Sequence, residues 1–226
     1  MEQKVGQGTW FTDRQKKFLA VVSQEKNFKD KFYLTGGTAL TAVYYNHRYS
    51  QDLDFFSAHE FTSPEVGYML SRTIKKLGWV GIRQNINYPV NMYVLTWADG
   101  YSLKLDFTFF AFDRLQIGKQ VLGVEIDSIP DIAVNKLEAI LGRKEARDYV
   151  DLYTIMTHEK INILDIYKLH LEKVGYKIDN LALARLLISV REVSNYPKMK
   201  VPFNKEEMFT FFEKEAKTLE SQIFTA

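Results

Sequence analysis

The sequence predicts an α+β fold, with a small mixed β-sheet and flanking helices in the first half and helices throughout the second half. Between residues 32 and 126, short apolar runs alternate with one or two helical patterns. From Pro130 onward, apolar residues recur at helical spacing almost without interruption. We therefore expect two domains, residues 1–128 and residues 129–226.

Composition sets the class of protein and excludes some chemistry. The chain has 226 residues, of which 46% are hydrophobic and 14% aromatic, so it can bury a substantial core. The formal net charge of +2 excludes a strongly basic nucleic-acid clamp or an acidic disordered tail as the dominant design. The chain has no cysteine, which excludes disulfides, thiolate zinc sites and cysteine nucleophiles. Any chemistry must use oxygen and nitrogen groups.

Two features bear on localisation. No apolar run approaches the roughly 18 residues that a membrane-spanning helix needs. The opening residues 1–6 lack the apolar stretch and small-residue cleavage site of a secretory signal. We expect a cytoplasmic protein without a membrane partner.

The elements of the first half follow from caps, turns and apolar runs. A first helix opens at Phe11 with Thr12 or Asp13 as its N-cap, and another starts at Ser63-Pro64 and ends near Gly78. A third helix, over 38–45, follows a glycine pair directly. Strands are predicted over 32–35, 53–56, 90–97, 101–109 and 121–126.

The clearest local signal is a hairpin. The runs 90–97 and 101–109 are joined through Ala98-Asp99-Gly100, a typical turn sequence. The second run alternates, so that Lys104 and Asp106 share its polar face. In the second half, helices are predicted over 131–141, 145–156, 164–174, 181–190 and 205–224.

Carboxylates on neighbouring strands suggest a metal site. Asp52 and Asp54 lie at positions i and i+2 at the start of a strand, so both point to the same side. Asp106 is also a polar residue within an apolar strand. Three such carboxylates would repel one another without a cation, and Mg²⁺ or Mn²⁺ suits a ligand set made only of oxygens. Taken separately, each aspartate is more simply read as a solvated strand end or the polar face of a half-exposed strand.

The glycine pair Gly36-Gly37 stands between a buried strand and a helix. At such a position, backbone N–H groups and the positive end of the helix dipole converge, and a phosphate can approach without meeting a Cβ atom. Alone, two glycines are more often a tight turn. Together with the aspartates, they favour nucleotide binding at a metal site.

Four blocks in this order resemble the AbiEii/AbiGii toxin nucleotidyltransferases of the polymerase-beta-like superfamily. The first is Gly36-Gly37-Thr38-Ala39-Leu40, and the second runs from His47 to Phe56 through Asp52-Leu53-Asp54. The third and fourth are Lys136-Leu137-Glu138-Ala139-Ile140 with Arg143, and Arg147-Asp148 followed by Asp151-Leu152-Tyr153. The resemblance stretches over residues 36–153, about half of the chain.

The resemblance implies a small nucleotidyltransferase core whose active site is completed by the helical domain. It further implies a bacterial toxin that transfers nucleotides from an NTP, with the acceptor end of tRNA as one known acceptor, and a DNA-binding antitoxin encoded beside it. Gly36 and Gly37 match the residues that hold the triphosphate, and Asp52 and Asp54 match the metal ligands. Residues matching other motif positions are Ser50, Lys136, Asp148 and Asp151. Because Gly37 has no hydroxyl, Thr38 would supply any side-chain contact to a phosphate.

The implied reaction is an in-line attack of a hydroxyl on the α-phosphate of an NTP, with pyrophosphate leaving. Asp106 would bind a second metal ion or accept the proton of the hydroxyl. Lys136 would neutralise triphosphate charge and share a helix face with Arg143. Lys104 would neutralise the carboxylates or reach a phosphate.

Some roles stay open. Arg48, with His47, is either surface polarity or a contact to phosphate or acceptor nucleic acid. Asp151 either forms a helical salt bridge with Arg147 or acts in the site, whereas Asp148 points elsewhere and is the stronger candidate. Two other functions also remain: a non-catalytic module that binds NTP or the antitoxin, and nucleotidyl transfer to a small molecule.

Overall fold

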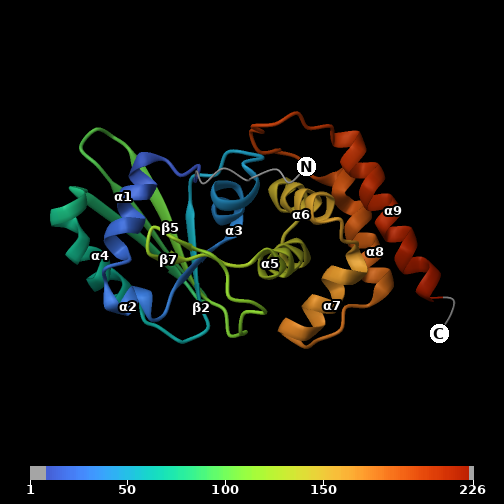
Figure 1. Ribbon diagram of the computed structural model, residues 1–226, viewed down its shortest axis with the longest axis horizontal. Helices are drawn as coiled ribbons and strands as arrows, with labels where there is room; N and C mark the ends of the chain where they lie inside the picture. Colours follow the sequence, from blue (N-terminus) through green and yellow to red (C-terminus); the bar gives the residue numbers. More distant parts are fainter. Residues whose placement is uncertain (1–8, 224–226) are drawn as a thin grey trace, which may run out of the picture. The chain divides into compact units, whose positions relative to one another are not determined.

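The structure, a computed structural model, describes residues 9–223 and divides into two compact units (Figure 1). Unit 1 comprises Met1–Asn46, Ser50–Phe110 and Gln120–Glu125. Unit 2 comprises His47–Tyr49, Ala111–Lys119 and Ile126–Ala226. The units alternate along the chain, and the division at residue 128 stays a prediction. The opening segment 1–6 and the predicted helix end at residue 224 lie outside the described residues.

Unit 1 is built on a five-stranded sheet in the order β1-β2-β5-β4-β3. The strands β2 and β5 run parallel, and the other neighbouring pairs are antiparallel. The predicted mixed sheet is therefore confirmed. The strand bounds are Tyr33–Thr35 (β1), Leu53–Ser57 (β2), Gly81–Asn87 (β3), Val90–Thr96 (β4) and Ser102–Phe109 (β5).

One face of this sheet is covered by helices. Figure 1 shows α1 (Asp13–Val22), α2 (Lys26–Lys29) and α4 (Ser63–Leu77) grouped beside the strands. Phe55 of β2 stacks on Phe107 of β5 and also meets rings from α1 and α2. Both phenylalanines are fully buried. Because side chains alternate along a strand, the residues next to Phe55 in β2 and next to Phe107 in β5 point to the other face of the sheet.

Sequence reasoning placed most of unit 1 correctly; besides the short helix α2, which was not predicted, there are four differences. The strand β3 was missed because its residues are mostly polar and it lies exposed at the sheet edge. The predicted strand 121–126 is instead a tight hairpin of β6 (Gln120–Val121) and β7 (Val124–Glu125). Its turn residues Leu122 and Gly123 have positive φ angles of 53° and 78°, which reverse the chain.

The other two differences concern helix starts. The N-cap of α4 is Thr62, one residue before the predicted Ser63, in a capping box with Glu65. The helix expected over 38–45 begins earlier, as α3 (Gly36–Ala39), and continues as a π-helix, η1 (Leu40–Tyr45). The N-cap of α1 is Thr12, as one of the two alternatives predicted.

Unit 2 is helical, as predicted. Its helices are α5 (Ile129–Gly142), α6 (Ala146–Glu159), α7 (Ile163–Val174), α8 (Asn180–Ile188), the 3₁₀ turn η2 (Ser189–Glu192) and α9 (Lys205–Ile223). Fully buried side chains such as Leu137, Tyr149 and Phe212 form its core. The segment His47–Tyr49 joins this unit through an antiparallel bridge between Arg48 and Met199. None of the helices within residues 9–223 has both the length and the apolar character to cross a membrane.

Candidate active site

Three aspartates gather on the face of the sheet opposite the Phe55 core. Asp54 on β2 lies directly across from Asp106 on the parallel strand β5. Asp52 precedes Asp54 by two residues, and its side chain is 39% exposed, against 17% for Asp106. The predicted cluster of carboxylates on neighbouring strands is thus present in unit 1.

Lys104 lies between two of these carboxylates. Its Nζ is 2.6 Å from Oδ2 of Asp106 and 3.2 Å from Oδ2 of Asp52. Burial alone would lower the pKa of Lys104, but the hydrogen bond and charge of Asp106 raise it. Lys104 is thus paired with both Asp52 and Asp106.

The residues present fit a divalent cation by their chemistry. Oδ1 of Asp106 is buried and has no hydrogen-bond partner. Because an unpaired buried carboxylate oxygen is costly, a cation that bound it would stabilise the site. Among the described residues, no three His, Asp or Glu side chains are arranged as a metal-binding group. In this structure, Lys104 is the cation between Asp52 and Asp106.

Gly36 fits closely against Asp54. Its φ angle is +72°, a value that L side chains rarely adopt, and a Cβ atom there would overlap Oδ2 of Asp54. Gly36 and Gly37 form the first turn of α3, and the N-cap residue Thr35 makes no side-chain cap hydrogen bond. Helix-start N–H groups without such a cap can donate to an anionic ligand. The structure thus brings the glycine pair and Asp54 together.

Thr38 and Ser50 form hydrogen bonds next to the aspartates. Thr38 is 1% exposed, and its hydroxyl donates to the backbone oxygen of Asp52. The Thr38 hydroxyl is also 2.8 Å from the hydroxyl of Ser50. The phosphate contact expected of Thr38 stays a prediction. Its hydroxyl fixes the backbone at Asp52.

A second, buried ionic cluster lies in unit 2, around Asp151 of α6. The carboxylate accepts from Nε and from one terminal nitrogen of Arg48, at 2.6 and 2.7 Å. Nε2 of His47 is 2.8 Å away, and Nζ of Lys136 is 2.6 Å away. Burial alone would raise the pKa of Asp151, but the adjacent charges of Arg48 and Lys136 hold that pKa well below its ordinary value.

Asp148 completes this ionic cluster. Its two oxygens lie 2.7 Å from Nζ of Lys136 and 3.1 Å from Nε of Arg143. Burial would raise the pKa of Asp148, and the charges of Lys136 and Arg143 lower it overall. The helix α5 ends at Gly142, so Arg143 does not continue the helix as expected, yet it reaches the same carboxylate as Lys136. Cations and carboxylates are closely matched here.

Two interpretations of this cluster need correction. Arg48 was considered as a surface residue or a phosphate contact, but it is 4% exposed and bound to Asp151. The helical salt bridge between Arg147 and Asp151 is absent from the described ion pairs, because Arg147 is exposed while Asp151 is occupied by other cations. The contact of His47 with Asp151 was missed because the two residues are 104 positions apart and leave no local pattern in the sequence.

Comparison with known proteins identifies the family of this chain. The family model described as nucleotidyl transferase AbiEii toxin, type IV TA system, matches residues 17–221. An uncharacterized protein of Aquifex aeolicus is 29% identical over 188 residues, which cover 82% of this chain and 86% of that protein.

Two solved structures share the fold. The crystal structure of JHP933 from Helicobacter pylori has a TM-score of 0.61 at 20% identity and covers 95% of each chain. A putative nucleotidyltransferase from H. pylori has a TM-score of 0.59 at 22% identity, covering 94% of this chain and 96% of its own. The match of the family model over most of the sequence decides the family. The chain belongs to the AbiEii family of nucleotidyl transferase toxins of type IV toxin–antitoxin systems.

Proposed function

We propose that the protein transfers a nucleoside monophosphate from an NTP to a hydroxyl of an RNA acceptor, the acceptor end of a tRNA. The observation that carries this proposal is the pairing of Asp54 with Asp106 on parallel strands, with Asp52 on the same side. Gly36, which has no Cβ, adjoins Asp54 at a helix start. Together these residues combine an oxygen ligand set with backbone donors suited to a triphosphate.

Asp52, Asp54 and Asp106 would hold Mg²⁺ or Mn²⁺, which, when bound, neutralises phosphate charge and orients the reacting oxygens. The N–H groups of Gly36 and Gly37 would bind the triphosphate. Oδ1 of Asp106 has no hydrogen-bond partner, so it can take either role expected of this residue, metal ligand or acceptor of the hydroxyl proton. This proton must leave as the new bond to the α-phosphate forms and pyrophosphate departs.

Lys104, which forms ion pairs with Asp52 and Asp106, would limit the mutual repulsion of these carboxylates before substrate binds. When a dication is bound by the carboxylates, the ammonium group of Lys104 could instead form an ion pair with a phosphate of the NTP. Lys104 therefore has a supporting role in both states.

The buried ionic cluster of unit 2 would act through the backbone. Asp151 fixes Arg48, and Arg48 stands four residues before Asp52 in the sequence. Lys136 is matched by Asp148 and Asp151, and it is 6% exposed. We assign these residues, with Arg143, to fixing the 47–49 segment within unit 2. In the cell, we expect a cytoplasmic toxin with an adjacent DNA-binding antitoxin.

The test is transfer itself. The purified protein is incubated with each α-labelled NTP, Mg²⁺ and total RNA, and the products are separated by size. We expect label in a small RNA, and none with Asp52→Asn, which preserves side-chain volume. Glu65→Gln, on α4 of the same unit, is a control for the loss of a carboxylate elsewhere.

Three outcomes would contradict the proposal. Label in small molecules alone would indicate transfer to a small-molecule acceptor. No transfer at all under any NTP would indicate a binding module. Growth arrest that persists with Asp52→Asn would show that toxicity does not depend on this chemistry.

A further inference from the structure

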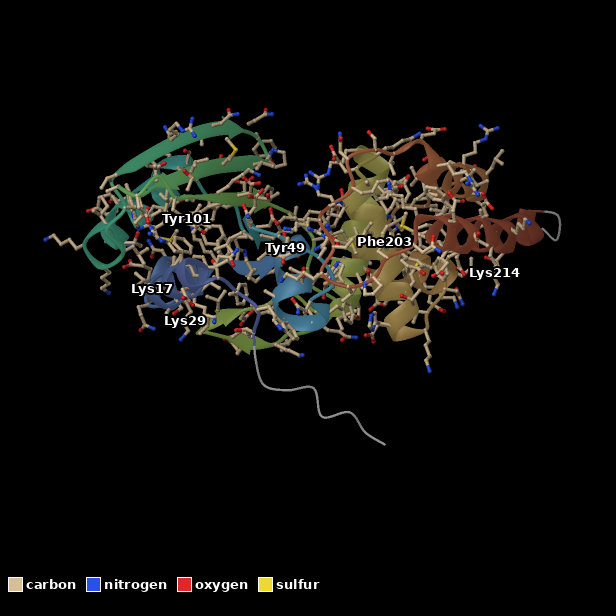
Figure 2. The ribbon with its side chains drawn as sticks, turned by 90° about the horizontal axis from the view of Figure 1, so that it is seen from above. Lys17, Lys29, Tyr49, Tyr101, Phe203 and Lys214 are labelled. Atoms are coloured by element: carbon tan, nitrogen blue, oxygen red, sulfur yellow. The ribbon has the colours of Figure 1, made fainter. Side chains whose placement is uncertain are left out.

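An aromatic and basic patch lies on unit 2, where Tyr49 is flanked by Lys198 and Lys200. Tyr49, labelled in Figure 2, is 49% exposed. The Nζ atoms of Lys198 and Lys200 are 4.9 and 5.0 Å from the centroid of its ring. We call these three residues the Tyr49 patch.

The Tyr49 patch is held in place by backbone pairing. The N–H of Tyr49 donates to the carbonyl of Lys198, and the N–H of Lys200 donates to the carbonyl of His47, both at 2.9 Å. The bridge between Arg48 and Met199 lies between these two bonds. This short ladder sets the register of the two segments, so Tyr49 lies opposite Lys198.

A buried ion pair fixes the same segment from the inside. Arg48 is 4% exposed and binds both oxygens of Asp151, whereas the next residue, Tyr49, is half exposed. His47 and Arg48 both contact the buried Asp151, so the interior contacts of this segment end at Arg48 and the ring of Tyr49 lies at the surface. The exposed ring of Tyr49 is therefore carried by a segment that is held by backbone pairing on one side and by the Arg48–Asp151 ion pair on the other.

The surroundings of the patch favour an anion. Residues 193–204, the connection between η2 and α9, contain Lys198 and Lys200 but no Asp or Glu. Burial lowers the pKa of Lys200, which shows that its ammonium is partly desolvated. A desolvated ammonium interacts more strongly with a phosphate than a fully hydrated one does. Cation–π contacts at exposed positions are weak, so a phosphate can draw the lysines off the ring.

We propose that the Tyr49 patch binds a single-stranded segment of the acceptor RNA, with a base stacked on Tyr49 and phosphates bound by Lys198 and Lys200. Aromatic rings beside lysines that follow the backbone are typical of single-strand binding without sequence preference. Tyr49 precedes Asp52 by three residues, and an extended chain of that length spans at most about 11 Å. The identification of the strand as acceptor rests on the proposed function.

Binding to a defined probe tests this inference. Fluorescence anisotropy is measured with a labelled twelve-nucleotide single-stranded RNA and with the same RNA in a duplex. We expect Tyr49→Leu to weaken single-strand binding about tenfold, and Tyr49→Phe to restore it, because a phenyl ring also stacks. Weaker binding of the duplex, whose bases are already stacked, is the accompanying expectation.

The lysines give a separate readout. Lys198→Ala and Lys200→Ala should each weaken binding, and each should reduce the slope of log K against log salt by about 0.7. Lys168→Ala, on α7 of the same unit with a side chain 77% exposed, should change neither quantity. Thermal melting of each variant identifies any loss of folding.

Failure of the inference is distinguishable from failure of the proposed function. If Tyr49→Leu binds the probe as the wild type does and labels RNA with an unchanged KM for RNA, the patch assignment is wrong. This holds even when Asp52→Asn abolishes transfer. Equal binding of duplex and single strand would also overturn it. If the patch variants lose RNA binding as expected while no transfer is found for the wild type, the patch stands and the reaction does not.

Discussion

The two charged clusters use similar residues in opposite ways. In unit 1, Lys104 pairs with Asp52 and Asp106, the side chains of Lys104 and Asp52 are more than a third exposed, and a buried oxygen of Asp106 lacks a hydrogen-bond partner. In unit 2, Asp148 and Asp151 are fully buried, and every described oxygen of theirs is matched by a cation. The first cluster therefore has an unpaired carboxylate oxygen beside accessible side chains, and the described oxygens of the second are all paired.

This difference separates chemistry from support. A buried carboxylate oxygen without a partner is unfavourable for folding and is retained where a ligand compensates it. A matched buried cluster excludes ligands and instead fixes the geometry of the segments that it joins. The substitutions below should therefore affect activity in unit 1 and stability in unit 2.

The largest effect is expected at the carboxylates of unit 1. Asp106→Asn should lower the rate of nucleotidyl transfer by about 10²–10³, because it removes an electrostatic contact to the reacting groups. The free energy of unfolding should stay the same or rise, since one of several like charges is lost. Initial rates and urea unfolding on the same preparation give both numbers. An unstable variant with normal turnover would reverse the assignment.

Next is the buried ion pair of unit 2. Asp151→Asn leaves Arg48 buried without its charge partner and should cost about 3–5 kcal/mol of the free energy of unfolding. Urea denaturation followed by circular dichroism measures this loss. Arg147→Ala, four residues earlier on the exposed side of α6, should change stability by less than about 0.5 kcal/mol. Equal effects of the two substitutions would restore the helical salt bridge as the role of Asp151.

A smaller effect is expected at Gly36. Gly36→Ala places a side chain at a φ angle of +72° and against Asp54, which should cost about 1–3 kcal/mol and reduce transfer. Gly67 on α4 is the matched control, because nothing lies within 4 Å of its added Cβ. Gly67→Ala should stabilise the protein by about 0.4–1 kcal/mol. Unfolding curves of the pair decide whether the position of Gly36 is strained.

The smallest expected effect is a dependence of the free energy of unfolding on pH in the acid range. The pKa values of Asp148 and Asp151 are lowered in the folded protein, so their stabilisation is complete above the unfolded value of about 3.9. It is lost as the pH falls through the lower, folded values. The free energy of unfolding should therefore decrease below about pH 4, and less steeply in Asp148→Asn. Identical slopes would show that these groups are not responsible.

Sequence reasoning succeeded where the signal is local. The Asp52-Leu53-Asp54 spacing, the glycine pair and the alternating strand around Asp106 each depend on neighbours along the chain, and the structure brings them together. Helix positions in unit 2 were also recovered, because a buried helical face repeats at fixed spacing.

The missed features depend on tertiary contact. Arg48 and Asp151 are 103 residues apart, so no local pattern predicts their pairing. An exposed edge strand such as β3 has too few apolar residues to show alternation. The role of Thr38 was likewise hidden, because its hydroxyl meets the backbone oxygen of Asp52 and the hydroxyl of Ser50, 12 to 14 residues further along the chain.

The central claim is that the carboxylates of unit 1, and not the fully buried ones of unit 2, bind the metal. Binding of Mn²⁺ in the presence of NTP, followed by electron paramagnetic resonance, tests it directly. Wild-type protein should bind Mn²⁺, Asp106→Asn should bind at least about tenfold more weakly, and Asp151→Asn, kept cold so that it stays folded, should bind as the wild type does. Normal binding by Asp106→Asn, together with loss of binding in folded Asp151→Asn, would contradict the account.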